Sequence, residues 1–411
     1  MPRFENWART VVTRPREKHV PGSETELCEI LGRTRGRVRV VGGAHSWSRI
    51  NAPEDVWVSL DRLRGVTLDG DRAIVAGGTR LHDVIAELDA RGMALPIVGS
   101  ISAQSIAGAI ATGTHGSSLI HGNLASCVTG LRVVTPATRE LTHEGPRVHL
   151  GALGVVTGVT LNIVPAFGLA ETVEDIAIGE LGSRIQAIAR SAEYVKVWWM
   201  PNAARAQIFR YERTQDRGAG RPAMRRRLDN ALHRSVFPII ARLGAKARWN
   251  PAITRLVVDS FRTKRRVGPG WLMLSTPMPF RHRETEGAVA MARAGEAIDR
   301  LVAAQARAKL LVNFPLEIRF VKGDGAWASP AYGGDVCQIG AYAQGTVEPY
   351  FELFWREMRA VNARPHWGKE MDHTHRELAP LYPALDQFVA LRDELDPQRR
   401  FSSAFHDRVL G

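Results

Sequence analysis

Cysteine and lysine are scarce in this 411-residue chain. The three cysteines, Cys28, Cys127 and Cys337, lie far apart and show no paired spacing, which argues against a disulfide framework and against a cysteine-based zinc site. Because lysines are few, the net charge of +13 comes almost wholly from arginine. This balance favours anionic partners without identifying one. We expect a reducing, cytoplasmic environment.

The sequence also lacks a recognisable leader or membrane segment. The first residues contain no apolar stretch after a basic residue, so no secretory signal is expected. Two uncharged stretches, 93–114 and 150–170, are long enough to span a bilayer. Both are rich in Gly, Ser and Thr and each contains a proline, so we interpret them as buried turns of a soluble core.

The hydrophobic content of 45% can support more than one core, and the length favours roughly two or three domains. A capping box that starts at Ser23 predicts a short helix, and residues 37–41 alternate like a strand. The order of strand, turn and helix recurs at 73–76 and 81–88. The first part of the chain is therefore predicted to be an α/β unit.

The composition changes from about residue 171. Aromatic strands are predicted at 195–200 and 207–211, followed by a strongly basic tract at 213–266. Apolar residues between the positive charges of this tract suit an amphipathic helix on an anionic surface, or a solvated helical face, which is the commoner case. We expect a second domain to begin here.

A predicted strand at 40–41 runs straight into a loop of small residues that contains His45. Small residues let backbone amides approach a bound anion, and consecutive amides can hold a diphosphate. The loop matches neither the Gly-x-Gly-x-x-Gly nor the Gly-Lys-Ser/Thr pattern. Taken alone, His45 would more often be a hydrogen-bonded loop histidine than a functional residue.

Residues 99–118 are nearly all small or hydroxyl-bearing. A packed core needs bulk, so this composition suggests a backbone held against a large flat ligand. A close crossing of a helix and a strand would favour the same residue types. Taken together with the first loop, the ligand interpretation gains weight.

Two later motifs bring charges together. Glu317 and Arg319 are two residues apart in a predicted strand, 316–320, and so face the same side. Such a pair could hold sugar hydroxyls and favour loss of a hydroxyl proton, or it could be an ordinary exposed ion pair. Residues 364–369, Arg-Pro-His-Trp-Gly-Lys, carry two cations, an imidazole and an indole on a turn fixed by proline and glycine. The spacing of the histidines gives no metal-ligand set.

The order of these motifs resembles that of the sugar-1,4-lactone oxidases and dehydrogenases, of the gulono- and arabinono-lactone types, in the vanillyl-alcohol-oxidase flavoprotein superfamily. The resemblance runs nearly end to end and is weakest from about 171 to 310. It is carried by the His-Ser loop, Ile106 to Gly116, Gly151 to Val156, Glu317 to Arg319, Arg364 to Lys369, and the tail from Leu395 to Gly411.

The resemblance implies an α+β protein with the two-domain PCMH-type FAD-binding fold, which consists of two α/β subdomains and carries an inserted α+β substrate domain. The implied parts are an FAD-binding domain at 1–170, a substrate or cap domain at 171–365, and a C-terminal segment at 366–411 that returns to the FAD domain.

The resemblance also implies FAD as the cofactor, with a covalent bond to the flavin through His45, because relatives often use the histidine of this loop. A neutral imidazole nitrogen is a nucleophile, which suits that role. The residues implied at the FAD are Val41, Gly42, Gly43, Ala44, His45, Ser46, Trp47, Gly99, Ser100, Ser102, Ala107, Gly108, Thr112, Thr114, His115, Gly116, Val155 and Val156.

The implied catalytic residues are Glu317, Arg319 and Lys369. The first two stand where relatives bind substrate, and Lys369 would lie beside the flavin edge that becomes negative on reduction, where a fixed cation stabilises the charge. A strand at 335–342 should face the flavin. Its Gln338 and Gly340 stand where polyol oxidases tend to have His and Thr, which weakens a polyol interpretation. The implied substrate-binding residues are Ser105, Gln338 and His366.

The implied reaction is FAD-dependent oxidation of a sugar-derived alcohol, foremost L-gulono- or D-arabinono-1,4-lactone, to the keto-lactone by hydride transfer to flavin N5. Dioxygen or an external acceptor would take the electrons. A polyol oxidase or another specialised alcohol oxidase of the same fold is one alternative. A protein that binds anionic lipid or nucleic acid through residues 213–266 is another, although this tract lacks the interleaved aromatic and basic residues of an RNA platform. We expect no specific nucleic acid and only weak association with anionic surfaces.

Overall fold

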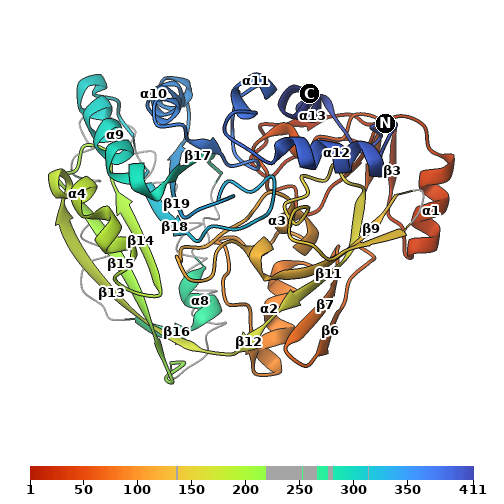
Figure 1. The fold of residues 1–411 in the computed structure, drawn as a ribbon, viewed down its shortest axis with the longest axis horizontal. Helices are drawn as coiled ribbons and strands as arrows, with labels where there is room; N and C mark the ends of the chain where they lie inside the picture. The colour runs from red at the N-terminus through yellow and green to blue at the C-terminus, as the bar shows by residue number, and fades with distance from the viewer. Residues whose placement is uncertain (136–137, 219–251, 253–265, 276–280, 313) are drawn as a thin grey trace.

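The computed structural model describes residues 1–135, 138–218, 252, 266–275, 281–312 and 314–411. Most of the basic tract predicted at 213–266 lies outside these residues. The described elements form two groups that lie side by side in an α+β fold (Figure 1). No helix among the described residues is long and apolar enough to cross a membrane.

The first group contains a small parallel sheet of order β3-β5-β4, packed against helix α1. The Ser23 side chain accepts a hydrogen bond from the backbone N–H of Glu26 at 3.1 Å, so the predicted N-cap is confirmed. The predicted strand at 37–41 is also confirmed, as β4. The bounds are β3 Glu17–His19, α1 Glu24–Arg33, β4 Val38–Val40 and β5 Val56–Val58.

Next to it lies an antiparallel sheet of order β10-β9-β11-β7-β6, whose buried side chains pack against helices α2 and α3. The predicted strand and helix at 73–76 and 81–88 are confirmed as β7 and α2. The bounds are β6 Val66–Asp69, β7 Arg72–Ala76, α2 Leu81–Ala90, α3 Ile106–Ala111, β9 Val128–Val134, β10 Thr138–Leu141 and β11 Val155–Asn162. Two short pairs flank these sheets: β1 Phe4–Glu5 with β2 Val12–Thr13, and β8 Met93–Ala94 with β12 Val164–Pro165.

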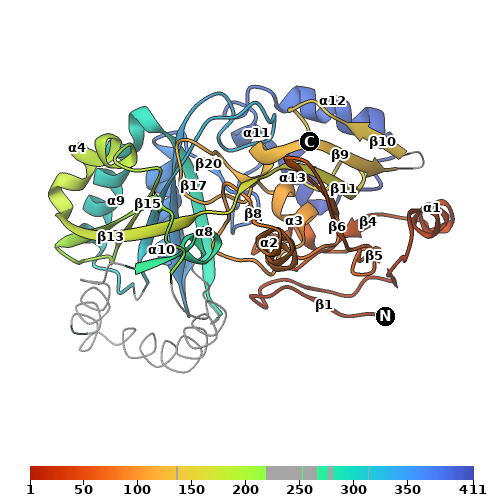
Figure 2. The ribbon, with the colours of Figure 1, turned by 90° about the horizontal axis from the view of Figure 1, so that it is seen from below.

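The second group is built on an antiparallel sheet whose described strands have the order β16-β13-β15-β14-β18-β19-β17-β20. Helices α4, α9 and α10 cover one face of this sheet, on the side away from the first group (Figures 1 and 2). The bounds are β13 Gly168–Ala177, α4 Ile178–Ala189, β14 Tyr194–Trp199, β15 Arg205–Thr214, β16 Arg266–Pro269, α8 Gly270–Leu274, β17 Arg283–Ala290, α9 Ala294–Ala308, β18 Leu316–Val321, β19 Val336–Ala343, α10 Glu348–Arg359 and β20 Arg364–Pro365.

The alternation of side chains along these strands gives the sheet two unlike faces. On β18, Leu316, Ile318 and Phe320 join the apolar core under the helices, whereas Glu317 and Arg319 point to the other face. That polar face is nevertheless buried, because the loops of the first group cover it. The sheet therefore presents charged side chains to the interface between the two groups.

The end of the chain packs against the first group. Helices α11 His375–Leu378, α12 Leu385–Leu395 and α13 Ala404–Leu410 follow the second group. The backbone N–H of Val38 donates to the carbonyl of Arg400 at 2.6 Å, and His406 Nε2 lies 3.0 Å from the carbonyl of Leu150. The domain boundaries at 170 and 365 stay a prediction, but these contacts show that the last residues lie beside the N-terminal sheets.

Candidate active site

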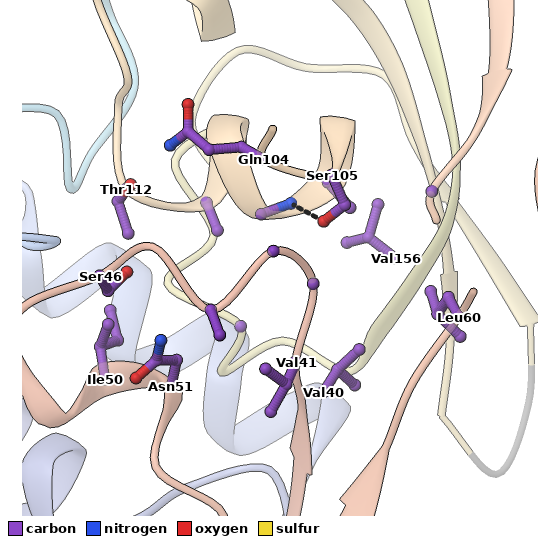
Figure 3. A pocket seen from close by; sticks show the side chains of 18 of the residues that line it. Val40, Val41, Ser46, Ile50, Asn51, Leu60, Gln104, Ser105, Thr112 and Val156 are labelled. Atoms are coloured by element: carbon purple, nitrogen blue, oxygen red, sulfur yellow. Dashed lines mark hydrogen bonds between the residues drawn. The ribbon is translucent and has the colours of Figure 1, made fainter. Parts of the chain in front are cut away.

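A cavity of about 820 Å³ lies where the loop after β4, the start of α3 and the turn before β11 meet (Figure 3). Its walls are mainly backbone and small side chains. Ser105 caps α3 by accepting a hydrogen bond from the N–H of Gly108 at 3.3 Å. The lining includes Val40, Val41, Gly42, Gly43, Ala44, His45, Ser46, Asn51, Gly77, Gly78, Ser105, Gly108, Thr112, His149, Gly151 and Val156.

The glycines of these loops also serve close packing within the chain. A Cβ on Gly42 would stand 1.9 Å from Ser105 Oγ, and one on Gly77 would stand 2.1 Å from the carbonyl oxygen of Val156. The segments approach one another without side chains, and their backbones form the cavity wall.

Two buried polar side chains on this cavity fit an anionic, polar ligand. Arg39 is 3% exposed, and its Nε and Nη2 have no hydrogen-bond partner within the described part of the chain. The oxygen and nitrogen of the Asn51 side-chain amide are also buried, and neither has a hydrogen-bond partner among the described residues. Burial lowers the pKa of Arg39 only to about 10, so the guanidinium stays charged at neutral pH. Buried charges are normally paired, and a diphosphate would supply that pair.

His149 holds two cavity loops together. The backbone N–H of Gly151 donates to His149 Nδ1 at 3.1 Å, so Nε2 carries the hydrogen and donates to the carbonyl of Ala107 at 3.1 Å. Burial lowers the pKa of His149 to about 4. The ring is therefore a neutral crosslink between two loops of the cavity.

His45 lies where this cavity meets a second one. Burial, helped by the charges of Arg80 and Lys369, lowers the pKa of His45 to about 4, so its imidazole is neutral at physiological pH. Its Nδ1 is buried and has no hydrogen-bond partner among the described residues. A neutral, unpartnered ring nitrogen at a cavity wall is available as a nucleophile.

The second cavity, of about 610 Å³, shares His45, Ser46, Gln104 and Thr112 with the first. It lies between the N-terminal loops and the polar face of the large sheet. Its other lining residues include Trp47, Gly99, Ser100, Thr114, His115, His282, Glu284, Glu286, Arg319, Tyr342, His366, Gly368 and Lys369.

Arg319 lines the second cavity, whereas Glu317 is buried beneath it and does not. The Glu317 carboxylate accepts hydrogen bonds from Trp198 Nε1 at 2.9 Å, from the Tyr342 hydroxyl at 2.7 Å and from Arg319. Glu317 is buried and the Arg319 side chain is only 12% exposed, so the interpretation as an exposed ion pair is wrong.

Although burial alone would raise the pKa of Glu317, the charges of Arg319 and Lys196 and the hydrogen bonds lower it to about 2. A carboxylate so fully engaged is a weak base. Its geometry suits positioning Arg319 rather than taking a proton.

Strand pairing explains the shape of the sheet beneath this cavity. Gly340 on β19 is the register partner of both Glu317 on β18 and Glu286 on β17. Because Gly340 has no side chain, a gap separates the two carboxylates. The atoms nearest to a Cβ there would be those of the Tyr342 side chain, at 3.4 Å or more.

Three groups that could bind a metal, His115, Glu286 and His366, have ligand atoms within 4.8 Å of one another. The hydrogen bonds favour a different use. His115 Nε2 lies 2.9 Å from Glu286 Oε1, and the N–H of Gly368 donates to His366 Nδ1 at 3.0 Å. His366 Nε2 therefore carries the hydrogen, which prevents metal ligation through it. Burial lowers the pKa of His366 to about 3, so the ring is a fixed neutral donor beside the cavity.

Lys369 also faces the second cavity. Its Nζ lies 2.5 Å from Glu284 Oε2 and 4.3 Å from the centre of the Trp47 ring. Burial alone would raise the pKa of Glu284, but the charge of Lys369 lowers it, so the carboxylate is ionised. The turn that carries Lys369 is fixed to the His-Ser loop, because the N–H of Trp47 donates to the carbonyl of Gly368 at 2.7 Å.

The structure gathers most of the sequence-predicted residues around these cavities. Of those assigned to the cofactor, Gly116 lines a third cavity of about 330 Å³, beside Arg319. Ser102 and Val155 line none of the three. Val155 points into the core beside α1, because its neighbour Val156 faces the first cavity and successive strand residues alternate.

The predicted substrate-binding residues are only partly together. His366 lines the second cavity, whereas Ser105 lines the first. Gln338 faces the polar side of the sheet but lines no described cavity. It pairs in register with Arg319, one row beyond Gly340, and its assignment to the substrate stays a prediction.

Sequence analysis missed the two carboxylates of β17, Glu284 and Glu286, and the cavity residues Arg39 and Asn51. The alternation in residues 283–286, Arg-Glu-Thr-Glu, is a strand signal, but it resembles that of an exposed strand. Only the pairing of β17 with β19 brings these carboxylates to the face that carries Arg319.

Comparison with known proteins agrees with this arrangement. Residues 159–409 match the family model described as D-arabinono-1,4-lactone oxidase, and residues 19–143 match an FAD binding domain. An L-gulono-1,4-lactone dehydrogenase of Mycobacterium tuberculosis is 31% identical over 100% of this chain and 99% of its own length. An L-gulonolactone oxidase of Bos taurus is 27% identical, with 99% and 98% covered.

Among solved structures, a cholesterol oxidase from B. sterolicum superposes with a TM-score of 0.77 at 17% identity, covering 100% of this chain and 96% of that one. This likeness concerns the fold alone. The relatives confirm both the FAD-binding fold and the resemblance found in the motifs. The chain belongs to the D-arabinono-1,4-lactone oxidase family of FAD-dependent oxidoreductases that act on CH–OH groups.

Proposed function

We propose that this protein oxidises an aldono-1,4-lactone, such as L-gulono- or D-arabinono-1,4-lactone, at a hydroxyl-bearing ring carbon to give the keto-lactone. The observation that carries the proposal is the second cavity, which adjoins the cofactor cavity at His45 and holds Arg319, His366 and Lys369 on its walls. These cations and donors match the hydroxyl and carbonyl oxygens of a neutral, oxygen-rich ring.

The residues that line the first cavity fit FAD. The first cavity has backbone walls, a buried unpaired guanidinium at Arg39 and an unpartnered amide at Asn51. When bound, FAD supplies the acceptor for the hydride at N5. Covalent attachment through His45 is part of the proposal, supported by the neutral imidazole and its unpartnered Nδ1.

Each polar residue of the second cavity has a role in this proposal. Arg319, fixed by Glu317 and Ser100, donates to the substrate hydroxyl oxygen and so favours loss of its proton to water as the hydride leaves. His366 donates from Nε2 to a second substrate oxygen. Lys369 provides positive charge where the reduced flavin becomes negative.

The electrons leave for dioxygen or for an external carrier, and we propose a cytoplasmic location, which the three free thiols support. Steady-state turnover in air, compared with turnover with an artificial acceptor under argon, distinguishes the two acceptors. The substrate proposal is tested by comparing kcat/KM for aldono-1,4-lactones with that for alditols. Preference for an alditol would replace the lactone by a polyol.

A further inference from the structure

Strand β17 carries two buried carboxylates, and each lies against a nitrogen-bearing side chain that lines the second cavity. Glu284 and Glu286 are 2% and 5% exposed and face the same side of the strand. Glu284 pairs with Lys369, with Oε2 and Nζ 2.5 Å apart, and Glu286 pairs with His115. The proposed function uses Lys369 but gives the two carboxylates no role.

The backbone fixes the Glu284–Lys369 pair. The N–H of Glu370 donates to the carbonyl of Glu284 at 2.9 Å, and the N–H of Lys369 donates to the carbonyl of His366 at 3.0 Å. The ammonium also rests over the Trp47 ring. The distance between the two charges is therefore set by the turn and the strand together.

The charge of Lys369 reaches the place where the flavin ring would lie. Lys369 and His45 line the same cavity, and after burial the charges of Arg80 and Lys369 contribute to the low pKa of His45. An ammonium at this position favours a reduced, anionic flavin. A carboxylate 2.5 Å from the ammonium opposes that effect, and the opposition is strong because both groups are shielded from water.

We propose that Glu284 tunes the redox potential of the flavin: it partly neutralises Lys369 and thereby keeps the potential lower than Lys369 alone would set it. Glu284 is a positioning residue in this role, because it acts through Lys369. The inference rests on the proposed place of the flavin ring beside His45, but it does not depend on which alcohol is the substrate.

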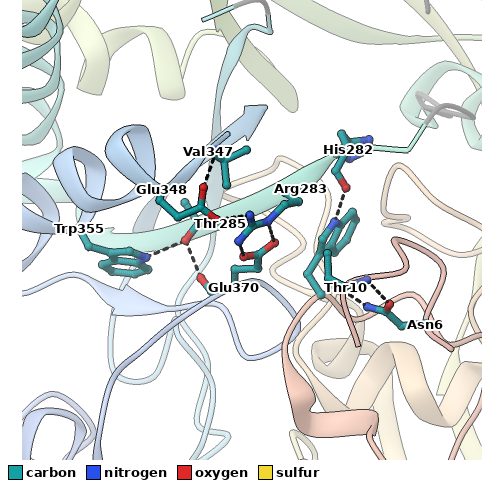
Figure 4. A network of polar contacts seen from close by, with 10 residues as sticks. Asn6, Thr10, His282, Arg283, Thr285, Val347, Glu348, Trp355 and Glu370 are labelled. Atoms are coloured by element: carbon teal, nitrogen blue, oxygen red, sulfur yellow. Dashed lines mark hydrogen bonds and ion pairs between the residues drawn. The ribbon is translucent and has the colours of Figure 1, made fainter. Parts of the chain in front are cut away.

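A purely structural role for Glu284 is less suited to the contacts, because other residues hold the strand. On the opposite face of β17, Arg283 pairs with Glu370 and Glu348 at 2.6 and 2.5 Å, and Thr285 Oγ1 donates to the carbonyl of Glu370 at 2.7 Å (Figure 4). Glu370 follows Lys369 in sequence, but its carboxylate belongs to this network on the opposite face of β17. Glu370→Gln therefore removes one negative charge and leaves the Glu284–Lys369 pair in place, which makes it a matched control.

The test is the midpoint potential of the holoenzyme, measured anaerobically against reference dyes. Glu284→Gln should raise it by about 30 mV or more, which is a tenfold shift for a two-electron couple. In a Lys369→Met background the same substitution should change the potential by much less. Glu370→Gln should leave it near the wild-type value.

An unchanged or lowered potential in Glu284→Gln overturns the proposal, as does an equal shift with and without Lys369, or an equal shift in Glu370→Gln. If Glu284→Gln does not accumulate as folded protein, Glu284→Asp replaces it. The shorter side chain lengthens the ion pair and should raise the potential, by less than Gln would. No rise in Glu284→Asp also overturns the proposal. Because dyes replace the substrate, a protein that binds FAD but does not oxidise lactones still gives a decisive result.

Discussion

Arg319 Nη2 donates to the carboxylate of Glu317 on its own strand and, at 2.6 Å, to the hydroxyl of Ser100 in an N-terminal loop. One guanidinium thus joins the large sheet to the loops that surround the cofactor cavity. Its orientation is set from both sides before any ligand arrives. Preorganised donors of this kind stabilise developing charge without reorganisation during the reaction.

Replacing Glu317 by Gln should slow flavin reduction by the lactone on the order of a hundredfold, because Arg319 loses its charged partner. FAD should remain bound, since Glu317 does not line the first cavity. Stopped-flow absorbance at the flavin band measures the rate. Glu180→Gln, which alters an exposed pair with Arg184, is the control. Unchanged reduction in Glu317→Gln would remove this residue from the account.

Gly42→Ala should prevent FAD binding, because the new Cβ would stand 1.9 Å from Ser105 Oγ and would displace the loop or the helix cap. Gly32→Ala in α1 is a matched control, since nothing lies within 4 Å of its Cβ position. The flavin-to-protein absorbance ratio after purification measures occupancy. Full occupancy in Gly42→Ala would show that the loop tolerates the shift.

His45→Ala should release the flavin from covalent attachment. Wild-type protein precipitated with acid should keep its yellow colour in the pellet, whereas the variant should leave all colour in the supernatant. Ser46→Ala, at the neighbouring position on the same cavity, should keep the colour in the pellet. Colourless wild-type pellets would exclude a tether at His45 without excluding FAD.

The FAD-free protein should lose stability as the pH falls below about 6.5, the ordinary histidine pKa. Burial lowers the pKa of His149 to about 4 in the folded state, so the unfolded chain binds the proton more readily between these values. This histidine contributes stability that is present above pH 6.5 and is lost as the pH falls toward 4. Between pH 7 and pH 5 the contribution of His149 to the free energy of unfolding falls by about 2 kcal/mol.

Urea unfolding of the wild type and of His149→Gln at pH 7 and at pH 5 isolates the contribution of His149. The free energy of unfolding should fall by less in the variant, which lacks the titrating ring. An equal fall in both proteins would assign the acid sensitivity to other groups.

Local signals predicted much of the fold. The capping box at Ser23 and the alternation at residues 73–76 depend on neighbours in sequence, and α1 and β7 form where expected. The order of motifs predicted the family and located His45, Arg319 and Lys369 at the cavities.

The parts of the site that the sequence did not predict depend on strand register. Gln338 was assigned from the order of motifs alone, and its place opposite Arg319 follows from the pairing of β18 with β19. Glu284 and Glu286 acquire their place only because β17 pairs with β19, a strand about fifty residues away. A single sequence contains no record of that pairing.

The most direct test of the account is an anaerobic titration of the purified yellow protein with L-gulono-1,4-lactone, D-arabinono-1,4-lactone and an alditol, followed by absorbance. We predict that a lactone bleaches the oxidised flavin band at a stoichiometry near one, while the alditol bleaches it slowly or not at all. A flavin that every lactone leaves oxidised, and that an alditol bleaches, would contradict the assignment.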